Sequence, residues 1–275
     1  MIDLAVIILT GNERLHIGRC LERLVPLEPR QIFVVDCFSK DGTRSIIEQA
    51  AASLHLCVRT VEHEWPGNQA IQFNWALNNL PLSEKWVLRL DADEWLTQEL
   101  IDELLIKLPQ LNDDVAGVVL KRRLIVGWLG NKWIMHGIYP TRILRLFRNG
   151  QAQYAEDMIM DEHLVVKGLI IEFDNDFVDE SLLSFEDWKE KHLNYVKREA
   201  QMAVERRVNK NKKLYYKLPP YFRAVAYFCL RYFLKLGFLD GLAGFRWHLR
   251  QGLWYRWLVD REIGRLRERN LGLRV

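Results

Sequence analysis

Short apolar runs alternate with amphipathic segments over the first 110 residues, and this alternation constrains the fold more than any other feature. Runs typical of strands lie at 4–9 (LAVIIL), 32–35 (IFVV), 55–61 (HLCVRTV) and 86–90 (WVLRL). Segments with helical spacing follow them at 12–24, 43–53, 68–80 and 97–108. The pattern predicts an α/β domain with a mainly parallel, Rossmann-like sheet. In such sheets ligands bind beyond the carboxyl ends of the strands.

The remainder of the chain changes character twice. Residues 115–175 are rich in strand patterns, and 184–207 form a long polar helical pattern. We therefore expect an α/β domain over residues 1–210 and a basic, aromatic helical segment over 211–275.

Composition excludes several classes of protein. Hydrophobic residues make up 49% and charged residues 27%, as in folded globular proteins. A net charge of +3 is too small to indicate nucleic-acid binding. The four cysteines show no CxxC spacing, which favours reduced thiols in a cytosolic compartment. The N-terminus lacks a basic region, so we expect no signal peptide. The sequence has no uncharged apolar run of about twenty residues, so we expect no transmembrane helix.

Three carboxylates, Asp91, Asp93 and Glu94, follow the strand at 86–90. Their mutual repulsion must be offset by a cation or by hydrogen bonds. Asp91 and Asp93 can face one point where the strand stops, an arrangement that suits Mg²⁺ or Mn²⁺ and a diphosphate. Surface turns also contain this pattern, so its position after a buried strand is what favours a metal site.

Polar residues also follow the first two strands. Thr10, Asn12 and Glu13 end the first, and Asp36 ends the second. These groups can meet a nucleotide, and they can equally cap the helices that follow.

A later carboxylate pair, Asp161 and Glu162, precedes another strand pattern in MIMDEHLVVKG. A carboxylate there can take a proton from a hydroxyl group, or the pair can form a solvated acidic turn. His163 could hold that carboxylate or bind metal, although a lone histidine usually does neither.

In order along the chain, VIILTGNE, VVDCFSKDGT, LRLDADEWL and MDEH resemble the family 2 glycosyltransferases, which have the GT-A fold. EWPGNQAIQFNWAL and GWLGNKWIMHGIYPTRILRLFRNG resemble the bacterial members that build lipopolysaccharide core and exopolysaccharide. The resemblance covers residues 3–205, and the segment after it resembles the tail of the exopolysaccharide members.

The resemblance implies inverting transfer of a sugar from a nucleotide sugar, with UDP expected, to a hydroxyl of a lipid-linked saccharide. The implied donor-site residues are Thr10, Asn12, Glu13, Asp36, Gln69, Asn74, Arg89 and Asp91. Asp93 is implied as the principal ligand of Mn²⁺ or Mg²⁺, and Glu162 as the catalytic base with Asp161 as the alternative. Many members carry an acidic residue where this chain has Cys37, so the contacts with uracil are expected to differ.

Two further sets of side chains are candidates. Three arginines at irregular spacing could assist a phosphate, although such arginines usually face solvent: Arg142, Arg145 and Arg148. Three aromatic residues could stack on an acceptor sugar, although core packing is expected for at least one: Trp128, Trp133 and Tyr139.

The region 219–258 interleaves aromatic and basic residues on apolar helical patterns. At 100° per residue, Arg223, Arg231 and Lys235 fall within about a third of a turn. This pattern suits the lipid headgroup zone, and it equally suits packing on the catalytic domain or a homo-oligomer interface. We expect a cytoplasmic protein, peripherally associated with the inner membrane.

Two other functions fit the sequence less well. Nucleotidyltransferases should show a longer Gly-rich loop after the first strand, which ILTGNERLHIG lacks. A catalytically degenerate GT-A protein acting as a membrane-associated assembly partner is disfavoured by the intact Asp91, Asp93 and Glu162.

Overall fold

The structure is a computed structural model that describes residues 1–154, 164–205 and 214–272. The described residues form two compact units. The first comprises 1–125, 140–154 and 164–182, and the second comprises 126–139, 183–205 and 214–272. The helix α5 (Phe185–Val204) thus belongs to the second unit, and it lies before the boundary predicted at residue 210.

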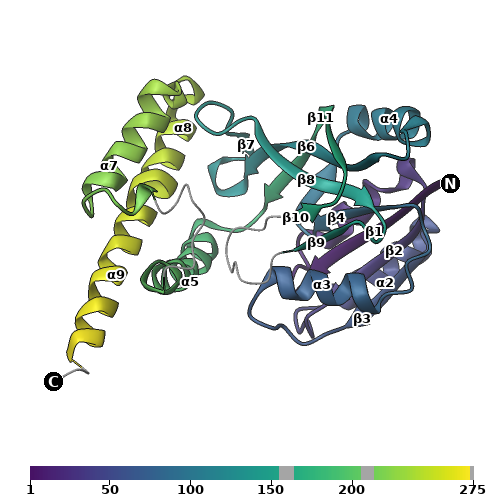
Figure 1. Cartoon of the computed structure of the whole chain (residues 1–275), viewed down its shortest axis with the longest axis horizontal. Helices are drawn as coiled ribbons and strands as arrows, with labels where there is room; N and C mark the ends of the chain where they lie inside the picture. Colours follow the sequence, from purple (N-terminus) through teal and green to yellow (C-terminus); the bar gives the residue numbers. More distant parts are fainter. Residues whose placement is uncertain (155–163, 206–213, 273–275) are drawn as a thin grey trace. The chain divides into compact units, whose positions relative to one another are not determined.

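The first unit is built on one mixed sheet (Figure 1). Its strand order begins β3 (Val58–Glu62), β2 (Pro29–Asp36), β1 (Ile2–Thr10) and β4 (Trp86–Asp91). It continues with β8 (Thr141–Arg148), β6 (Val115–Val126), β11 (Leu169–Ser181) and β5 (Glu94–Leu96). The first four strands are parallel, whereas β8 pairs antiparallel with both β4 and β6. The predicted α/β class is confirmed, and the strand-rich region extends the same sheet in antiparallel fashion.

Alternate side chains of β1 enter two separate apolar cores. Leu4, Val6 and Ile8 pack in the larger core with residues of α1 (Ile17–Glu22), α2 (Thr43–Leu54) and α4 (Gln98–Lys107). Ile7 and its neighbours on the other face pack against α3 (Gln69–Asn79). Helices therefore cover both faces of the strand, which explains why its sequence is continuously apolar instead of alternating.

Local polar side chains set where two helices begin. The Asn68 side chain accepts from the backbone N–H of Ala70 at the start of α3, and Thr97 accepts from Leu100 at the start of α4. The helix expected from residue 12 begins only at Ile17, so that predicted start was wrong. Asn12 has a φ of +59°, which interrupts helical geometry and turns the chain after β1.

The second unit is helical and has its own core. It contains α5, α7 (Phe222–Cys229), π-helical turns at Leu230–Leu234 and His248–Trp254, α8 (Gly241–Trp247) and α9 (Tyr255–Gly272). Val196 and Ala200 of α5 pack against Tyr255, Val259 and Ile263 of α9. Among the described residues, none of the helices combines the length and the apolar character needed to cross a membrane.

Arg223 does not belong to an exposed basic stripe. Its side chain is 3% exposed and binds Asp260 of α9 through both Nε and Nη2. Arg223 therefore follows the packing alternative and not the lipid-facing one. The helical wheel could not show this, because its acidic partner Asp260 is 37 residues away. Trp247 and Tyr255 are likewise buried within this unit.

His192 gives the second unit a predicted pH dependence. Its ring stacks on Trp188 at 3.9 Å between centroids, and Nδ1 donates to the Trp188 carbonyl. Burial lowers the pKa of His192 to about 4, so the folded protein keeps the ring neutral below the pKa of the unfolded chain. We expect the free energy of unfolding to be unaffected above about pH 6.5 and to fall by about 1–3 kcal/mol as the pH drops towards 4.

Urea unfolding across this pH range measures the loss. His192→Phe, which retains the stacked ring, should flatten the slope, and His55→Gln on the exposed surface is the control. An equal slope in His192→Phe would show that other groups cause the acid sensitivity.

Candidate active site

The register of the parallel strands brings three predicted polar positions to one edge of the sheet. Thr10 pairs with Asp36 across β1 and β2, and Leu9 pairs with Asp91 across β1 and β4. The chain leaves β1 towards β2 on one side, while β4 lies on the other, so this edge is a topological switch point. The predicted convergence of Thr10, Asp36 and Asp91 is confirmed.

The loops that follow β1 and β2 brace each other. The Asn12 backbone N–H donates to Ser39 Oγ at 2.8 Å, and the Lys40 N–H donates to Asn12 Oδ1 at 2.9 Å. Asp36 is fully buried and accepts hydrogen bonds from both the backbone N–H and the hydroxyl of Ser39. Asn12 and Asp36 thus hold the shape of the edge through loop contacts. Neither side chain caps a helix, since the N-cap residues of α1 and α2 are His16 and Gly42.

Glu13 makes a second set of contacts that supports the loop after β1, and the role of His16 in it was not predicted from the sequence. Its backbone N–H donates to Thr43 Oγ1, and its carboxylate lies 2.6 Å from His16 Nδ1. His16 is buried, and its Nε2 accepts from the Leu182 N–H at 2.9 Å, so the proton shared with Glu13 is on Nδ1. This contact joins the loop after β1 to a residue 166 positions away, a separation that no local pattern reveals.

Phe38 is held in an unfavourable backbone conformation within these braced loops. Its φ is +54° and its side chain is 51% exposed. A bulky residue in the left-handed region costs about 1–2 kcal/mol, which glycine avoids. We therefore expect Phe38→Gly to be more stable than Phe38→Ala by about 1 kcal/mol, the reverse of the usual order.

Urea unfolding of the two variants tests this expectation directly. The pair Ser53→Gly and Ser53→Ala in α2, where φ is helical, should show the ordinary preference for alanine. Equal stabilities of the two Phe38 variants would mean that the loop relaxes and carries no strain.

Two buried arginines offset the repulsion among the carboxylates after β4. Arg89 Nη2 and Arg145 Nη2 each lie 3.2 Å from one oxygen of Asp91, and Arg145 also binds Glu94. Burial alone would raise the pKa of Asp91, but the two guanidinium groups lower it to about 2. Burial raises the pKa of Glu94, and Arg145 opposes that rise. Asp91 is therefore ionised, and both of its oxygens have cationic neighbours.

The predicted solvent exposure of the arginines was wrong for two of the three. Arg145 and Arg148 are 4% and 7% exposed, whereas Arg142 is exposed and pairs with Glu172 at 2.9 Å. Arg148 donates to the carbonyls of Val115 and Asn112 and lies over the Trp86 ring. Of the two neutralising cations, Arg145 could not be identified by spacing, since it is more than fifty residues from both of its partners.

Residues 5–162 match the family described as Glycosyl transferase family 2. The chain belongs to this family. Its enzyme class is accordingly glycosyltransferase, and the nucleotidyltransferase alternative is set aside.

Solved structures give more distant similarities. The crystal structure of S. aureus TarS 1–349 in complex with UDP is 15% identical, with a TM-score of 0.47; the match covers 96% of this chain and 92% of that one. The mannosyltransferase PcManGT from Pyrobaculum calidifontis, in complex with GDP-Man and Mn²⁺, is 20% identical with a TM-score of 0.49. That match covers 91% of this chain and 72% of the mannosyltransferase.

Three of the predicted donor-site residues lie around α3 and β4 of this glycosyltransferase. Asn74 is buried and exchanges two hydrogen bonds of 2.9 Å with the backbone of Tyr154, which joins α3 to β9 (Ala152–Tyr154). Arg89 is fully buried over the rings of Phe73 and Tyr154. Gln69 is half-buried at the first position of α3. The contacts of Asn74 and Arg89 hold α3, β4 and β9 together beside the strand-end edge.

Asp93 lies on the turn between β4 and β5 and is half-buried. Its backbone carbonyl accepts from the Glu180 N–H at 3.0 Å, which fixes the turn. The described part of the chain contains no group of three or more His, Cys, Asp or Glu side chains that could hold a metal. Mg²⁺ is usually held by one or two carboxylates together with substrate phosphates, so Asp93 fits a cation that binds with a diphosphate. Asp161, Glu162 and His163 lie outside the described residues.

The aromatic candidates for acceptor stacking contact other rings. Trp128 packs against Phe185, Trp188 and Trp247 within the second unit, which confirms the expected packing role for one of the three. Trp133 and Tyr139 meet edge to face at 5.5 Å between centroids. Their contact with a sugar stays a prediction.

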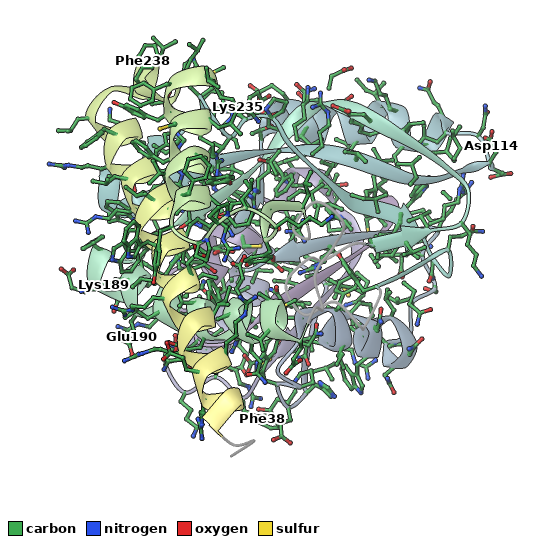
Figure 2. All side chains as sticks on the ribbon, turned by 60° about the vertical axis from the view of Figure 1, so that its left-hand side comes forward. Phe38, Asp114, Lys189, Glu190, Lys235 and Phe238 are labelled. Carbon is green, nitrogen blue, oxygen red and sulfur yellow. The ribbon has the colours of Figure 1, made fainter. Side chains whose placement is uncertain are left out.

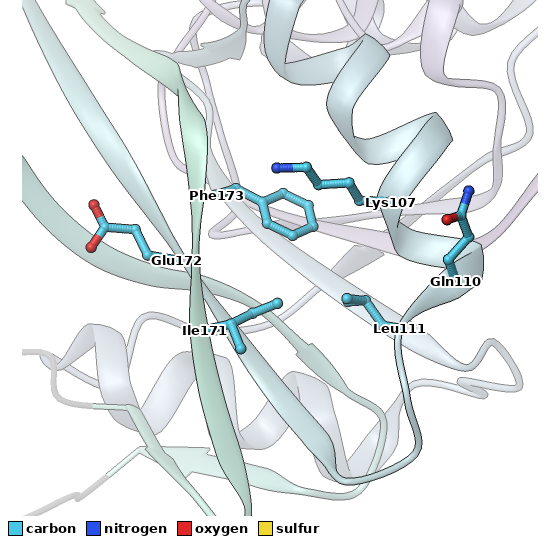
Figure 3. A pocket seen from close by; sticks show the side chains of 6 residues that line it. All are labelled: Lys107, Gln110, Leu111, Ile171, Glu172 and Phe173. Atoms are coloured by element: carbon cyan, nitrogen blue, oxygen red, sulfur yellow. The ribbon is translucent and has the colours of Figure 1, made fainter.

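A pocket of about 240 Å³ lies between α4 and β11 (Figure 3). Figure 3 shows Phe173 turned towards Lys107 and Glu172 on the other side of β11, and Lys107 Nζ lies 5.3 Å from the centre of the Phe173 ring. None of its six lining residues is a predicted site residue. This pocket therefore has no residue in common with the predicted donor site.

Proposed function

We propose that this family 2 member is an inverting, metal-dependent glycosyltransferase that moves a sugar from a nucleotide sugar to a hydroxyl of a lipid-linked saccharide. UDP is the proposed nucleotide, and bacterial lipopolysaccharide or exopolysaccharide biosynthesis is the proposed setting. The observation that carries the proposal is the edge where Thr10, Asp36 and Asp91 end adjacent strands at the switch point of the sheet. Asp93 follows on the turn after Asp91.

The polar groups of this edge support a nucleoside site. Thr10 is buried, and its hydroxyl has no hydrogen-bond partner among the described residues. A buried hydroxyl without a partner is unfavourable, and a ligand group could supply the missing bond. Asn12, Glu13 and Asp36 shape the same edge through their loop contacts, and Asp91 would lie near the ribose.

The proposed chemistry assigns separate tasks to the carboxylates. Glu162, or Asp161 as the alternative, would take the proton from the acceptor hydroxyl, which attacks the anomeric carbon from the face opposite the diphosphate. Asp93 would hold Mn²⁺ or Mg²⁺ with the diphosphate oxygens. When bound, that cation supplies positive charge to the leaving diphosphate.

The proposed location is the cytoplasmic face of the inner membrane. Its support is the region 219–258, where exposed aromatic and aliphatic side chains such as Phe222, Leu234 and Trp257 lie among basic residues. Peripheral binding there would hold the enzyme beside a lipid-linked acceptor.

Thermal unfolding with UDP, GDP or CMP, each with and without Mn²⁺, tests the proposed function. A ligand at about a hundred times its dissociation constant adds roughly 2.7 kcal/mol, or on the order of 5–10 °C for a chain of this size. We expect a Mn²⁺-dependent shift with UDP alone. A shift with GDP or CMP instead would mean that the donor carries that nucleotide and not UDP. No shift with any nucleotide would favour the alternative of a catalytically degenerate assembly partner.

A further inference from the structure

Apolar side chains gather at the bend between α7 and α8. Their exposed fractions run from 39% to 77%. This apolar tip consists of Leu230, Phe233, Leu234, Leu236, Phe238, Leu239, Leu242 and Phe245. Figure 2 labels Phe238 and Lys235 at this end of the helical unit, away from the end of α9. Soluble proteins seldom expose so many neighbouring large apolar side chains, and such patches mark surfaces of interaction.

The exposed charged side chains within residues 230–246 are both positive. Lys235 and Arg246 are exposed on either side of the bend. The one acidic residue of the segment 230–246 is Asp240, whose side chain is only 8% exposed and binds His136. Apolar groups flanked by exposed cations match an anionic lipid surface, which offers negative headgroups above an apolar interior.

Internal contacts hold the tip in shape. Asp240 accepts hydrogen bonds from the backbone N–H groups of Met135 and His136 and lies 2.6 Å from His136 Nδ1. Arg231 Nε donates to the Gly137 carbonyl. Gly237 leaves room for this packing, because a Cβ there would collide with the His248 ring. A preformed tip loses little conformational entropy when it binds.

We propose that the apolar tip, with Lys235 and Arg246, inserts into an anionic lipid bilayer as the membrane-docking element of this enzyme. The proposal rests on the proposed function, in which the acceptor is lipid-linked, and narrows the membrane contact from 219–258 to residues 230–246. A second copy of the chain is the competing occupant. It is disfavoured because two tips meeting about a two-fold axis would bring four exposed cations into one interface without an exposed acidic partner from residues 230–246.

Vesicle sedimentation with the full chain tests the docking element. Vesicles of phosphatidylethanolamine with phosphatidylglycerol are compared with vesicles of phosphatidylcholine alone. The double variant Leu234→Glu/Leu239→Glu changes two side chains that are 77% and 56% exposed, so its fold should be retained. Ile106→Glu on α4, at a side chain 63% exposed, is the matched control. Lys235→Glu/Arg246→Glu tests the charges separately.

We expect the wild-type chain to prefer the anionic vesicles. The leucine variant should lower that partition at least tenfold, the charge-reversal variant at least about thirtyfold, and Ile106→Glu should not change it. The thermal shift with UDP and Mn²⁺ should be the same in all variants, which separates a failure of docking from a failure of the proposed donor site.

Three results would overturn the docking proposal. One is a wild-type chain that binds neither kind of vesicle, and another is a leucine variant that binds as the wild type does. The third is a wild-type oligomer that the leucine variant converts to a monomer without any vesicle binding, which would assign the tip to a second copy of the chain.

Discussion

Asp93→Asn is expected to lower kcat/KM for sugar transfer by about 10²–10³-fold while leaving the fold intact. The substitution removes the charge proposed to hold the cation beside the diphosphate. It should spare the turn between β4 and β5, because the contact that fixes this turn is made by the Asp93 backbone carbonyl with the Glu180 N–H. Steady-state kinetics over a range of Mn²⁺ concentrations measure the effect, and the metal requirement of the residual activity should rise.

Asp113→Asn is the matched control. Its carboxylate is 90% exposed and lies 3.2 Å from Lys85 Nζ and 3.4 Å from Arg148 Nη2. Arg148 keeps its hydrogen bonds to the carbonyls of Val115 and Asn112 in this variant. Exposed pairs contribute little to stability, so this variant should keep wild-type activity and metal dependence. Full activity in Asp93→Asn with an unchanged Mn²⁺ response would show that another group holds the cation.

Arg145→Met is expected to have the largest effect on stability. The substitution removes a guanidinium group that binds both Glu94 and Asp91. Glu94 is only 2% exposed. Removing one member of a buried ion pair costs about 3–5 kcal/mol, because Glu94 must then be buried as an unpaired charge or take up a proton. Urea unfolding, followed by a probe in the first unit, should register this loss.

Two companion variants identify the cause. Arg142→Met on the same strand breaks an exposed pair with Glu172, and it should change the free energy of unfolding by less than about 1 kcal/mol. The double variant Glu94→Gln/Arg145→Met should recover part of the loss, since it no longer buries an unpaired charge at position 94. A double variant less stable than Arg145→Met would mean that packing around the guanidinium is the larger contribution.

Local sequence patterns were sufficient for the first half of the fold. The apolar runs of β1, β2 and β4 are long enough to be buried on both faces, and helical spacing follows each of them. Hydrophobic burial and the handedness of crossovers then leave few arrangements, so the parallel strands and the shared edge of Thr10, Asp36 and Asp91 could be predicted.

The later strands and the tail were less predictable. Nothing local in the strand at 141–148 shows that it lies beside β4, because antiparallel pairing depends on partners distant in sequence. The helical wheel placed Arg223 on one face with Arg231 and Lys235. In the structure Arg223 is buried within the second unit, where it binds Asp260 of α9.

The sequence by itself determined the α/β class, the family and the position of Asp91 and Asp93 at the end of a buried strand, because burial and spacing act over a few residues. Only the tertiary structure decided what surrounds those carboxylates. Arg145 reaches Asp91 and Glu94 from β8, and the Ser39 hydroxyl and backbone hold Asp36. Electrostatic pairing depends on distance in space and burial, so charges far apart in the chain become partners only once the sheet has formed.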